Sequence, residues 1–193
     1  MTQALPAPDV LADFLSDEAL ATAARETSVD FGALYERHMP RIYRYLLTRT
    51  ASREEAADLT QLVFVRALDS LAKYRPDRAP FVTWLFRIAR NAATDAHRRR
   101  KLTLSWDGLP EAPTVVEGHD PEAATLRRER LNRLREHLDL IDAPKRELLA
   151  LRFAGELSMR EIASVVGKSE WAVKKQLART IAKLKENYRD ELS

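Results

Sequence analysis

Apolar side chains recur at helical spacing along most of this 193-residue chain, and one stretch, residues 102–122, shows no period at all. The chain holds only five glycines, whereas an average composition of roughly 7% would give about thirteen. Because sheet proteins use glycine freely in tight turns, this scarcity favours helices. The chain is therefore predicted to be all-α.

The aperiodic stretch divides the chain into parts. It contains two glycines and three prolines, whose clustering is typical of a flexible linker. The expected order is an acidic N-terminal extension (1–26), a helical domain (27–101), the linker (102–122) and a second helical domain (123–193). The fold class is thus predicted as two small helical domains joined by a flexible linker.

Charge is segregated along the sequence although the net charge is only +3. Residues 87–101 hold six bases and one acid, and residues 168–189 hold seven bases and two acids. Residues 103–125 between them hold five acids and no base. Solvated helices usually mix their signs, so two separate basic blocks favour binding of a polyanion at two places.

Several function classes are excluded by what the sequence lacks. There is no cysteine, the four histidines are isolated, and no glycine-rich phosphate loop is present. We therefore expect no enzyme, no catalytic residue, no cofactor and no metal site. The sequence also lacks a signal peptide and an apolar run of about 18 residues, which predicts a cytoplasmic protein without membrane insertion.

Residues 158–175 carry the spacing of a helix-turn-helix. A small residue, Ala163, stands where the second helix would cross the first, and Gly167 follows for a turn with positive φ. Val173 then faces inward on the second helix. Residues suited to capping both helices complete the pattern: Ser158, Glu161 and Ser169.

The second of these helices has the two faces that a recognition helix needs. Residues near its start can reach base edges in the major groove, and cations further along can hold phosphates. Two interpretations of Trp171 stay open, because it could face outward or pack beneath the preceding helix over 144–155. The expected inner stripe is Val173, Leu177, Ile181, Leu184 and Tyr188.

The other basic block has a different character. After a proline-containing loop over 74–80, residues 81–91 interleave aromatic side chains with arginines on one predicted helix. Aromatic faces stack on unpaired bases while cations follow the backbone, which suits single-stranded DNA. Packing of the same aromatics into the core is the alternative, and composition alone favours it.

These segments resemble a known family. Asp58–Arg66, Phe81–Asp95 and Arg98–Arg100 look like region 2 of bacterial sigma factors, and the resemblance spans residues 27–101. Residues 123–190 are similar to region 4, on the segments Asp142–Glu147, Leu149–Phe153 and Leu157–Ala163. The chain is similar to the extracytoplasmic-function (ECF) group of the sigma-70 family, which has only these two regions.

The resemblance implies partners and residue roles. The expected partners are core RNA polymerase, through its β′ and β subunits, promoter DNA and an anti-sigma factor. Polymerase binding is implied for Asp58, Gln61 and Arg66. Melting and reading of the −10 element is implied for Arg75, Trp84, Arg87, Asn91, Arg98 and Arg99. Contact with the −35 element is implied for Trp171, Lys174, Lys175, Ala178 and Arg179.

The sequence departs from the family in two places. It reads Trp171-Ala172-Val173 where Gly-Thr-Val is usual, and it has Gln176 where arginine is frequent, so the family's −35 base preference does not carry over. The acidic extension has no family assignment and could either fold back onto residues 98–101 or stay solvated.

Two other functions remain as alternatives. One is a conventional helix-turn-helix regulator that binds duplex DNA as a dimer without polymerase. The other is an adaptor that uses its helical faces for protein contacts and binds no DNA.

Overall fold

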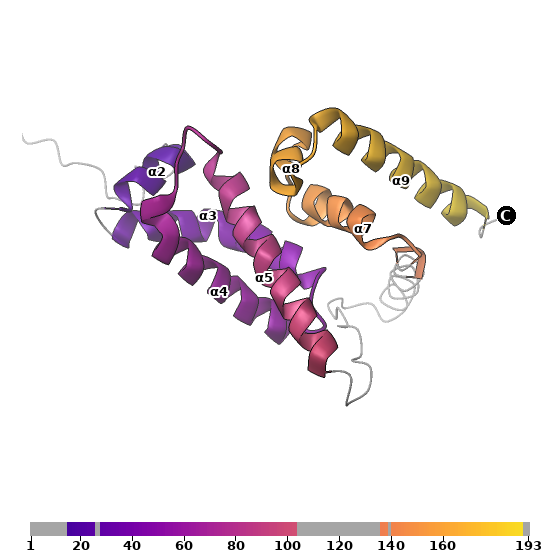
Figure 1. Cartoon of the computed structure of the whole chain (residues 1–193), viewed down its shortest axis with the longest axis horizontal. Coiled ribbons are helices and arrows are strands. Elements are labelled where there is room, and N and C mark those ends of the chain that lie inside the picture. The colour runs from indigo at the N-terminus through magenta and orange to yellow at the C-terminus, as the bar shows by residue number, and fades with distance from the viewer. Residues whose placement is uncertain (1–14, 26–27, 104–135, 139, 191–193) are drawn as a thin grey trace, which may run out of the picture.

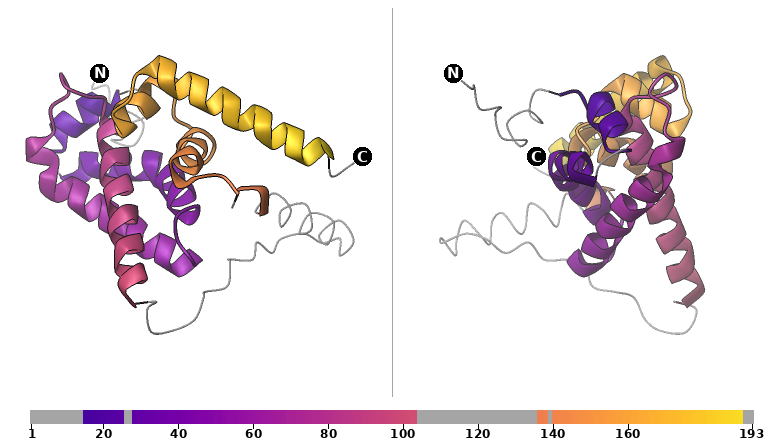
Figure 2. Two further views of the ribbon diagram at one scale, coloured as in Figure 1. Left: turned by 45° about the vertical axis from the view of Figure 1, so that its right-hand side comes forward. Right: turned by 90° about the vertical axis from the view of Figure 1, so that its left-hand side faces the viewer.

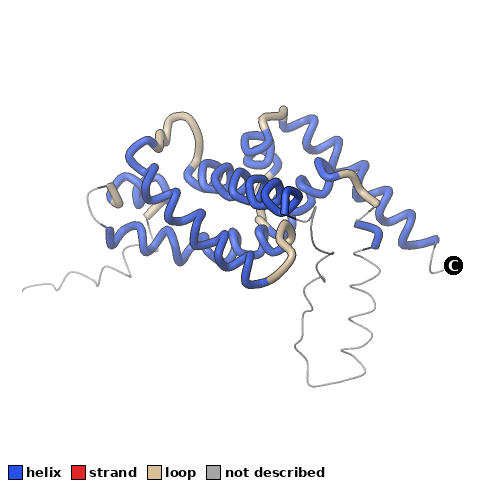
Figure 3. The backbone as a smooth tube through the Cα atoms, turned by 60° about the horizontal axis from the view of Figure 1, so that its bottom comes forward, coloured by secondary structure: helices blue, strands red, loops and turns tan. Residues whose placement is uncertain are grey.

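The computed structural model describes residues 15–25, 28–103, 136–138 and 140–190, which form two helical units (Figure 1). Within these ranges there is no β-strand, so the all-α prediction is confirmed (Figure 3). Most of the predicted linker, and most of the helical signal predicted before residue 141, lie outside the described residues.

The helices of the first unit (Figure 2) pack around an apolar core that continues into the second unit. Its elements are α2 (Asp17–Ala23), α3 (Ser28–Leu47), α4 (Arg53–Ser70), the 3-10 turn η1 (Leu71–Lys73) and α5 (Phe81–Thr103). Burial of one large apolar side chain stabilises the fold by roughly 1.5–3 kcal/mol. Fully buried members of this core include Leu34, Ile42, Tyr45, Val63, Phe81 and Leu85.

The start of α4 follows the capping pattern that the sequence predicts, with one difference. The Ser52 hydroxyl accepts a hydrogen bond from the Glu55 N–H at 3.1 Å, as expected. The Glu55 carboxylate accepts from the Ala51 N–H at 2.9 Å, one residue before the expected donor. Both bonds satisfy backbone donors at the helix entry, so the predicted start is confirmed.

Helix α3 is continuous at Pro40, where the sequence predicts a kink or a break, so the predicted break is wrong. The helix continues through Pro40 to Leu47. Proline removes one backbone hydrogen bond, here to the carbonyl of Glu36. Both residues are exposed, and buried side chains on both sides of the proline pack into the same core.

The second unit contains α7 (Ala143–Leu149), the π-helical turn η2 (Ala150–Ala154), α8 (Met159–Val166) and α9 (Glu170–Asp190). Asp142 caps α7 by accepting from the Lys145 N–H at 3.0 Å, and Pro144 lies in the first turn. The π-helical turn was not predicted. It closes with a hydrogen bond from the Gly155 N–H to the Ala150 carbonyl at 2.9 Å.

Helices α8 and α9 form the predicted helix-turn-helix. Gly167 ends α8 in the left-handed conformation, with φ of 69°, and Ser158 and Glu161 make both bonds of a capping box. Ala163 and Val173 are buried between the two helices, as their spacing predicted. The motif is confirmed in each of these features.

Candidate nucleic-acid interfaces

The outer face of α9 is open to solvent. Trp171, Lys174, Lys175, Ala178 and Arg179 are all exposed, and their spacing places them on one side of the helix. Trp171 is 68% exposed, so the interpretation in which it packs beneath the preceding helix is wrong. The Lys175 ammonium lies 4.4 Å from the centre of the Trp171 ring, which is a cation–π contact.

The aromatic side chains of α5 are divided between core and surface. Phe81 is fully buried, whereas Trp84 is half-buried with its ring centre 5.1 Å from that of Tyr74 and 5.5 Å from that of Phe81. Packing into the core is therefore confirmed for Phe81 and in part for Trp84, which keeps an accessible side, and stacking on unpaired bases stays a prediction. The helical spacing of residues 84, 87, 91 and 98 places them on one face of α5.

The polar residues on this face of α5 differ in their contacts. Arg87, Asn91, Arg98 and Arg99 are exposed, and the Arg98 guanidinium lies 3.9 Å from the Asp95 carboxylate. Arg75 is exposed in the preceding loop. Its guanidinium donates to the carbonyls of Ala72 and Tyr74, each at 3.2 Å.

A hydrogen bond from the side chain of Tyr74, its first residue, closes the loop over 74–80. The Tyr74 hydroxyl donates to the Ala79 carbonyl at 3.1 Å. Burial, with smaller contributions from the charges of Glu18 and Asp17, raises the pKa of Tyr74 to about 12. The hydroxyl therefore stays protonated at neutral pH and remains a donor.

The exposed face of α4 mixes polar and apolar side chains. Asp58 and Gln61 lie together on it, one turn apart, and both are exposed. Val65 and Leu68 continue the same face and are 55% and 47% exposed. Arg66 lies off this face, since its guanidinium is 3.8 Å from the Asp95 carboxylate on α5.

The two units also contact each other, and one contact centres on a buried acid of α7. Glu147 is 7% exposed and accepts a hydrogen bond from the Tyr45 hydroxyl at 2.6 Å. The guanidinium groups of Arg49 and Arg90 lie 2.9 and 3.8 Å from the same carboxylate. Burial and the neighbouring Glu147 charge raise the pKa of Tyr45 well above its ordinary value, so the hydroxyl remains a donor.

A second contact lies where η2 meets α3. Arg41 donates to the carbonyls of Gly155 and Glu156 at 3.0 and 3.1 Å, and Arg44 pairs with the Glu156 carboxylate at 2.6 Å. A Cβ at residue 155 would lie 2.7 Å from the Phe86 ring, so only glycine permits this approach. Glu156 itself has a positive φ of 54°, a strained conformation for a non-glycine residue.

The third contact engages a residue expected to touch promoter DNA. Arg87 donates to the Ser164 carbonyl from Nε at 3.1 Å and from Nη2 at 2.7 Å. Its Nη2 also donates to the Ser164 hydroxyl at 3.1 Å. Arg87 is therefore already bound by α8 of the helix-turn-helix.

We call the three contacts between the units the inter-unit interface. Its residues were not predicted from the sequence. Its main members are Arg41, Arg44, Tyr45, Arg49, Arg87, Arg90, Glu147, Gly155, Glu156 and Ser164. The paired residues lie 57 or more positions apart along the chain, so no local pattern could reveal them. The one local signal was Gly155, a glycine with no predicted turn to explain it.

Two further features bear on the class of protein. Among the residues that the structure describes, no group of three or more acidic, histidine or cysteine side chains could hold a metal ion. None of the described helices is long and apolar enough to cross a membrane.

Comparison with known proteins identifies the family. Residues 34–103 match the family model described as Sigma-70 region 2, and residues 131–184 match that of Sigma-70, region 4. The RNA polymerase sigma factor YlaC of Bacillus subtilis is 34% identical over 155 residues, which cover 80% of this chain and 89% of YlaC. The ECF sigma factor BldN of Streptomyces coelicolor is 31% identical over 159 residues, or 80% of this chain. The match spans only 60% of the length of BldN.

Solved structures share the fold. CnrH, determined in complex with the cytosolic domain of CnrY, gives a TM-score of 0.67 at 27% identity, covering 90% of this chain and 97% of CnrH. The sigma factor RpoE from Bartonella quintana, in complex with the anti-sigma factor NepR, gives 0.62 at 19% identity, covering 83% and 97%.

The chain belongs to the sigma-70 family of RNA polymerase sigma factors, within its ECF group. This is not an enzyme family, and it acts through promoter recognition in transcription initiation. The sigma-factor interpretation is therefore confirmed over the conventional duplex-DNA regulator.

Proposed function

We propose that this sigma factor docks on core RNA polymerase through the α4 face, opens and reads the −10 element with α5 and its preceding loop, and reads the −35 element with α9. Docking falls chiefly on the β′ subunit, with further contacts to β. The site of action is cytoplasmic, because that is where bacterial RNA polymerase works.

The exposed face of α4 is the observation that carries the proposal. Asp58 and Gln61 supply hydrogen-bonding groups, and Val65 and Leu68 leave apolar surface open beside them. Apolar groups rimmed by polar ones are typical of a surface that another protein covers. A protein that binds only duplex DNA has no use for such a face, whereas a polymerase subunit needs one.

The α5 surface suits a strand that has left the duplex. Trp84 offers one aromatic side beside exposed cations, and unpaired bases stack on aromatic rings while arginines hold the phosphates. The binding free energy of an extruded base at this surface offsets the cost of unstacking it, about a few kcal/mol, and so favours strand opening. Arg98 and Arg99, toward the C-terminal end of α5, are placed to hold the adjoining backbone.

The α9 surface suits duplex DNA in the major groove. Lys174, Lys175 and Arg179 can reach phosphates or guanine edges, and the exposed ring of Trp171 can contact the methyl group of thymine. Ala178 leaves room for close approach on the same face. This combination differs from the family's usual residues, so its preferred −35 bases are expected to differ as well.

The inter-unit interface implies that the described arrangement is a closed form. The −10 and −35 elements are about 25 base pairs apart, roughly 85 Å at ~3.4 Å per pair. Helices α5 and α9 are each only about 30–35 Å long at ~1.5 Å per residue, and they belong to units in direct contact. The units must therefore separate before both elements of straight promoter DNA can be bound.

An anti-sigma factor is the partner proposed to control the chain. The similar fold of RpoE was solved with the anti-sigma factor NepR, and CnrH was solved with the cytosolic domain of CnrY. The open α4 face would be available to such a partner when polymerase is absent. A partner that covers this face would compete directly with core polymerase.

Transcription reconstituted in vitro tests the proposal. Core polymerase is incubated with a promoter library, with and without the purified chain, and the transcription start sites are sequenced. We expect starts that depend on the chain and share −10 and −35 elements. Replacing Asp58 and Gln61 by alanine should abolish these starts and the binding of core, whereas Arg53→Ala, on another side of α4, should change neither. No chain-dependent start, or full core binding by the double variant, would contradict the proposal.

A further inference from the structure

Part of the N-terminal segment that the sequence left unassigned is built into the first unit. Leu20 and Ala21 of α2 are fully buried in the core of that unit. Helix α2 lies against the N-terminal end of α5, at the opposite end of that helix from residues 98–101 (Figure 1). The described part of the segment therefore does not shield the basic run.

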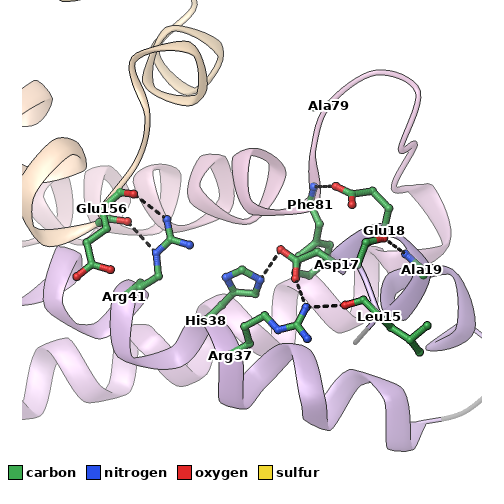
Figure 4. A network of polar contacts seen from close by, with 12 residues as sticks. Leu15, Asp17, Glu18, Ala19, Arg37, His38, Arg41, Ala79, Phe81 and Glu156 are labelled. Atoms are coloured by element: carbon green, nitrogen blue, oxygen red, sulfur yellow. Dashed lines mark hydrogen bonds and ion pairs between the residues drawn. The ribbon is translucent and has the colours of Figure 1, made fainter. Parts of the chain in front are cut away.

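Helix α2 is fixed to α3 by one acid. Asp17 accepts from the Arg37 guanidinium at 2.7 Å and lies 2.8 Å from Nε2 of His38, which is 2% exposed (Figure 4). Burial of Asp17 opposes its ionisation, but the contacts with His38 and Arg37 outweigh it and lower the pKa of the carboxyl. The Ser16 hydroxyl caps α2 by accepting from the Ala19 N–H at 3.2 Å.

From this position α2 reaches both ends of the loop over 74–80. Glu18 accepts a hydrogen bond from the Phe81 N–H at 3.2 Å, where the loop ends and α5 begins (Figure 4). That N–H has no partner within α5 because it lies in the first turn. The guanidinium of Arg25 donates to the carbonyl of Tyr74, where the loop starts.

The two anchored residues also hold the aromatic side chain predicted to meet DNA. The rings of Tyr74 and Phe81 pack edge-to-face, with centres 5.6 Å apart, and Trp84 rests against both. A shift of either anchor would move the loop and the Trp84 ring together. The position of this reading surface thus depends on two bonds from α2.

We propose that α2 is a positioning element for promoter reading, in which Glu18 and Arg25 hold the loop over 74–80 in its reading conformation. Neither residue needs to touch DNA. Their effect follows from preorganisation, because a loop that is already ordered loses less conformational entropy when it binds. The inference rests on the proposed function, in which this loop and α5 read the −10 element.

The experiment compares matched variants in transcription from promoters randomised at either element. Glu18→Ala removes the acceptor, whereas Glu18→Gln keeps an acceptor oxygen in place. Arg25→Ala removes the donor, and Arg25→Lys retains a cation. Thr22→Ala is the control, since among the contacts described its hydroxyl donates to the Glu18 carbonyl within α2, at 2.8 Å. Core binding and helix content are measured for every variant.

The expected result separates reading from folding. The variant with both Glu18→Ala and Arg25→Ala should lose −10 discrimination by about tenfold, the loss that one or two hydrogen bonds can cause. Its −35 preference and core affinity should match the wild type. Glu18→Gln should restore most of the discrimination, and Thr22→Ala should resemble the wild type.

Other outcomes overturn the inference in distinguishable ways. An unchanged −10 profile in the double alanine variant would show that α2 does not position the loop, while leaving the proposed function intact. Equal losses at both elements together with weaker core binding would show that α2 only supports folding. If the wild-type chain itself directs no −10-dependent start, the proposed function fails and the inference fails with it.

Discussion

The two predicted DNA surfaces differ in the contacts that their basic side chains already make within the protein. On α9, Lys174 and Arg179 are exposed, and Lys175 contacts only the neighbouring Trp171 ring among the contacts described. On α5, Arg87 is bound to Ser164 and Arg90 lies beside Glu147, both across the inter-unit interface. The −35 surface is thus available in the closed form, whereas the −10 surface is partly used to hold the units together.

Together with the proposed roles of α5 and α9, this difference predicts an order of promoter binding. Duplex DNA can meet α9 while the units stay closed, but the α5 surface becomes complete only after they separate. The α4 face proposed to dock on core polymerase is exposed while the units are in contact. Docking and −35 contact can therefore precede the release of Arg87, and release then makes strand opening possible.

Removal of the α9 cations should have the largest effect. The combined variant Lys174→Ala, Lys175→Ala and Arg179→Ala loses three contacts, each contributing about 1 kcal/mol or more, so −35 duplex affinity should fall by roughly 150-fold or more. Its affinity should also depend less steeply on salt, because fewer counterions are released. Fluorescence anisotropy with duplex DNA from 50 to 200 mM salt measures both, and Arg53→Ala serves as a charge control. Wild-type affinity in the triple variant would show that α9 is not the reading helix.

Loss of Glu147 should open the closed form. Glu147→Ala leaves Tyr45, Arg49 and Arg90 without their shared acceptor, and removing one partner of a buried ionic cluster costs about 3 kcal/mol. The radius of gyration from small-angle scattering should rise in the variant. Glu147→Gln, which keeps an acceptor for Tyr45, should open less. Equal radii for Glu147→Ala and the wild type would mean that the interface does not hold the units together.

Replacing Ser164 should raise the affinity for single-stranded −10 DNA, whereas replacing Arg87 should lower it. Ser164→Ala removes one of the acceptors of Arg87, so closure should weaken by about 1 kcal/mol and binding of single-stranded −10 DNA should improve by up to about fivefold. Arg87→Ala weakens closure as well, but it also removes the predicted DNA contact and should lower that binding. Anisotropy with a single-stranded oligonucleotide measures both variants. A decrease in both would argue against competition between the interface and DNA.

Lowering the pH should have the smallest effect of these changes. It should weaken the Asp17 contacts that fix α2 to α3 and so reduce the stability of the folded chain. The pKa of Asp17 is lowered in the folded chain, so its contribution to stability is complete above its unfolded value near pH 4 and is lost as pH falls through the folded value. Asp17→Asn should therefore cost about 1 kcal/mol at pH 7 and less at about pH 3, below the unfolded pKa. Urea unfolding at the two pH values gives the difference, and a cost that stays constant with pH would contradict this assignment.

Local patterns predicted the helices and the helix-turn-helix well, because their determinants lie within a few residues. The left-handed turn at Gly167 and the capping box of Ser158 follow directly from spacing. The exposure of Asp58 and Gln61 also follows from helical periodicity. Residues close in sequence fix such features, so no tertiary information was needed.

The sequence could not predict the features that depend on distant pairs. Glu147 and Tyr45 are 102 positions apart, and Glu18 and Phe81 are 63 apart, so neither pair leaves a local pattern. The break predicted at Pro40 does not occur, because burial on both sides of the proline outweighs one lost hydrogen bond. Trp171 stayed ambiguous because its environment depends on how α9 packs, which periodicity alone does not determine.

The distance between the two units, in the free chain and in the promoter complex, tests the account most directly. The chain has no cysteine, so Thr94→Cys on α5 and Ala143→Cys on α7, which are exposed and line one cleft between the two units, provide a unique pair of sites for dyes. Energy transfer between the dyes should be high in the free protein. With core polymerase and promoter DNA it should fall to the value expected for units reading elements roughly 85 Å apart along the DNA. The same high transfer in a complex that is active in transcription would contradict the account.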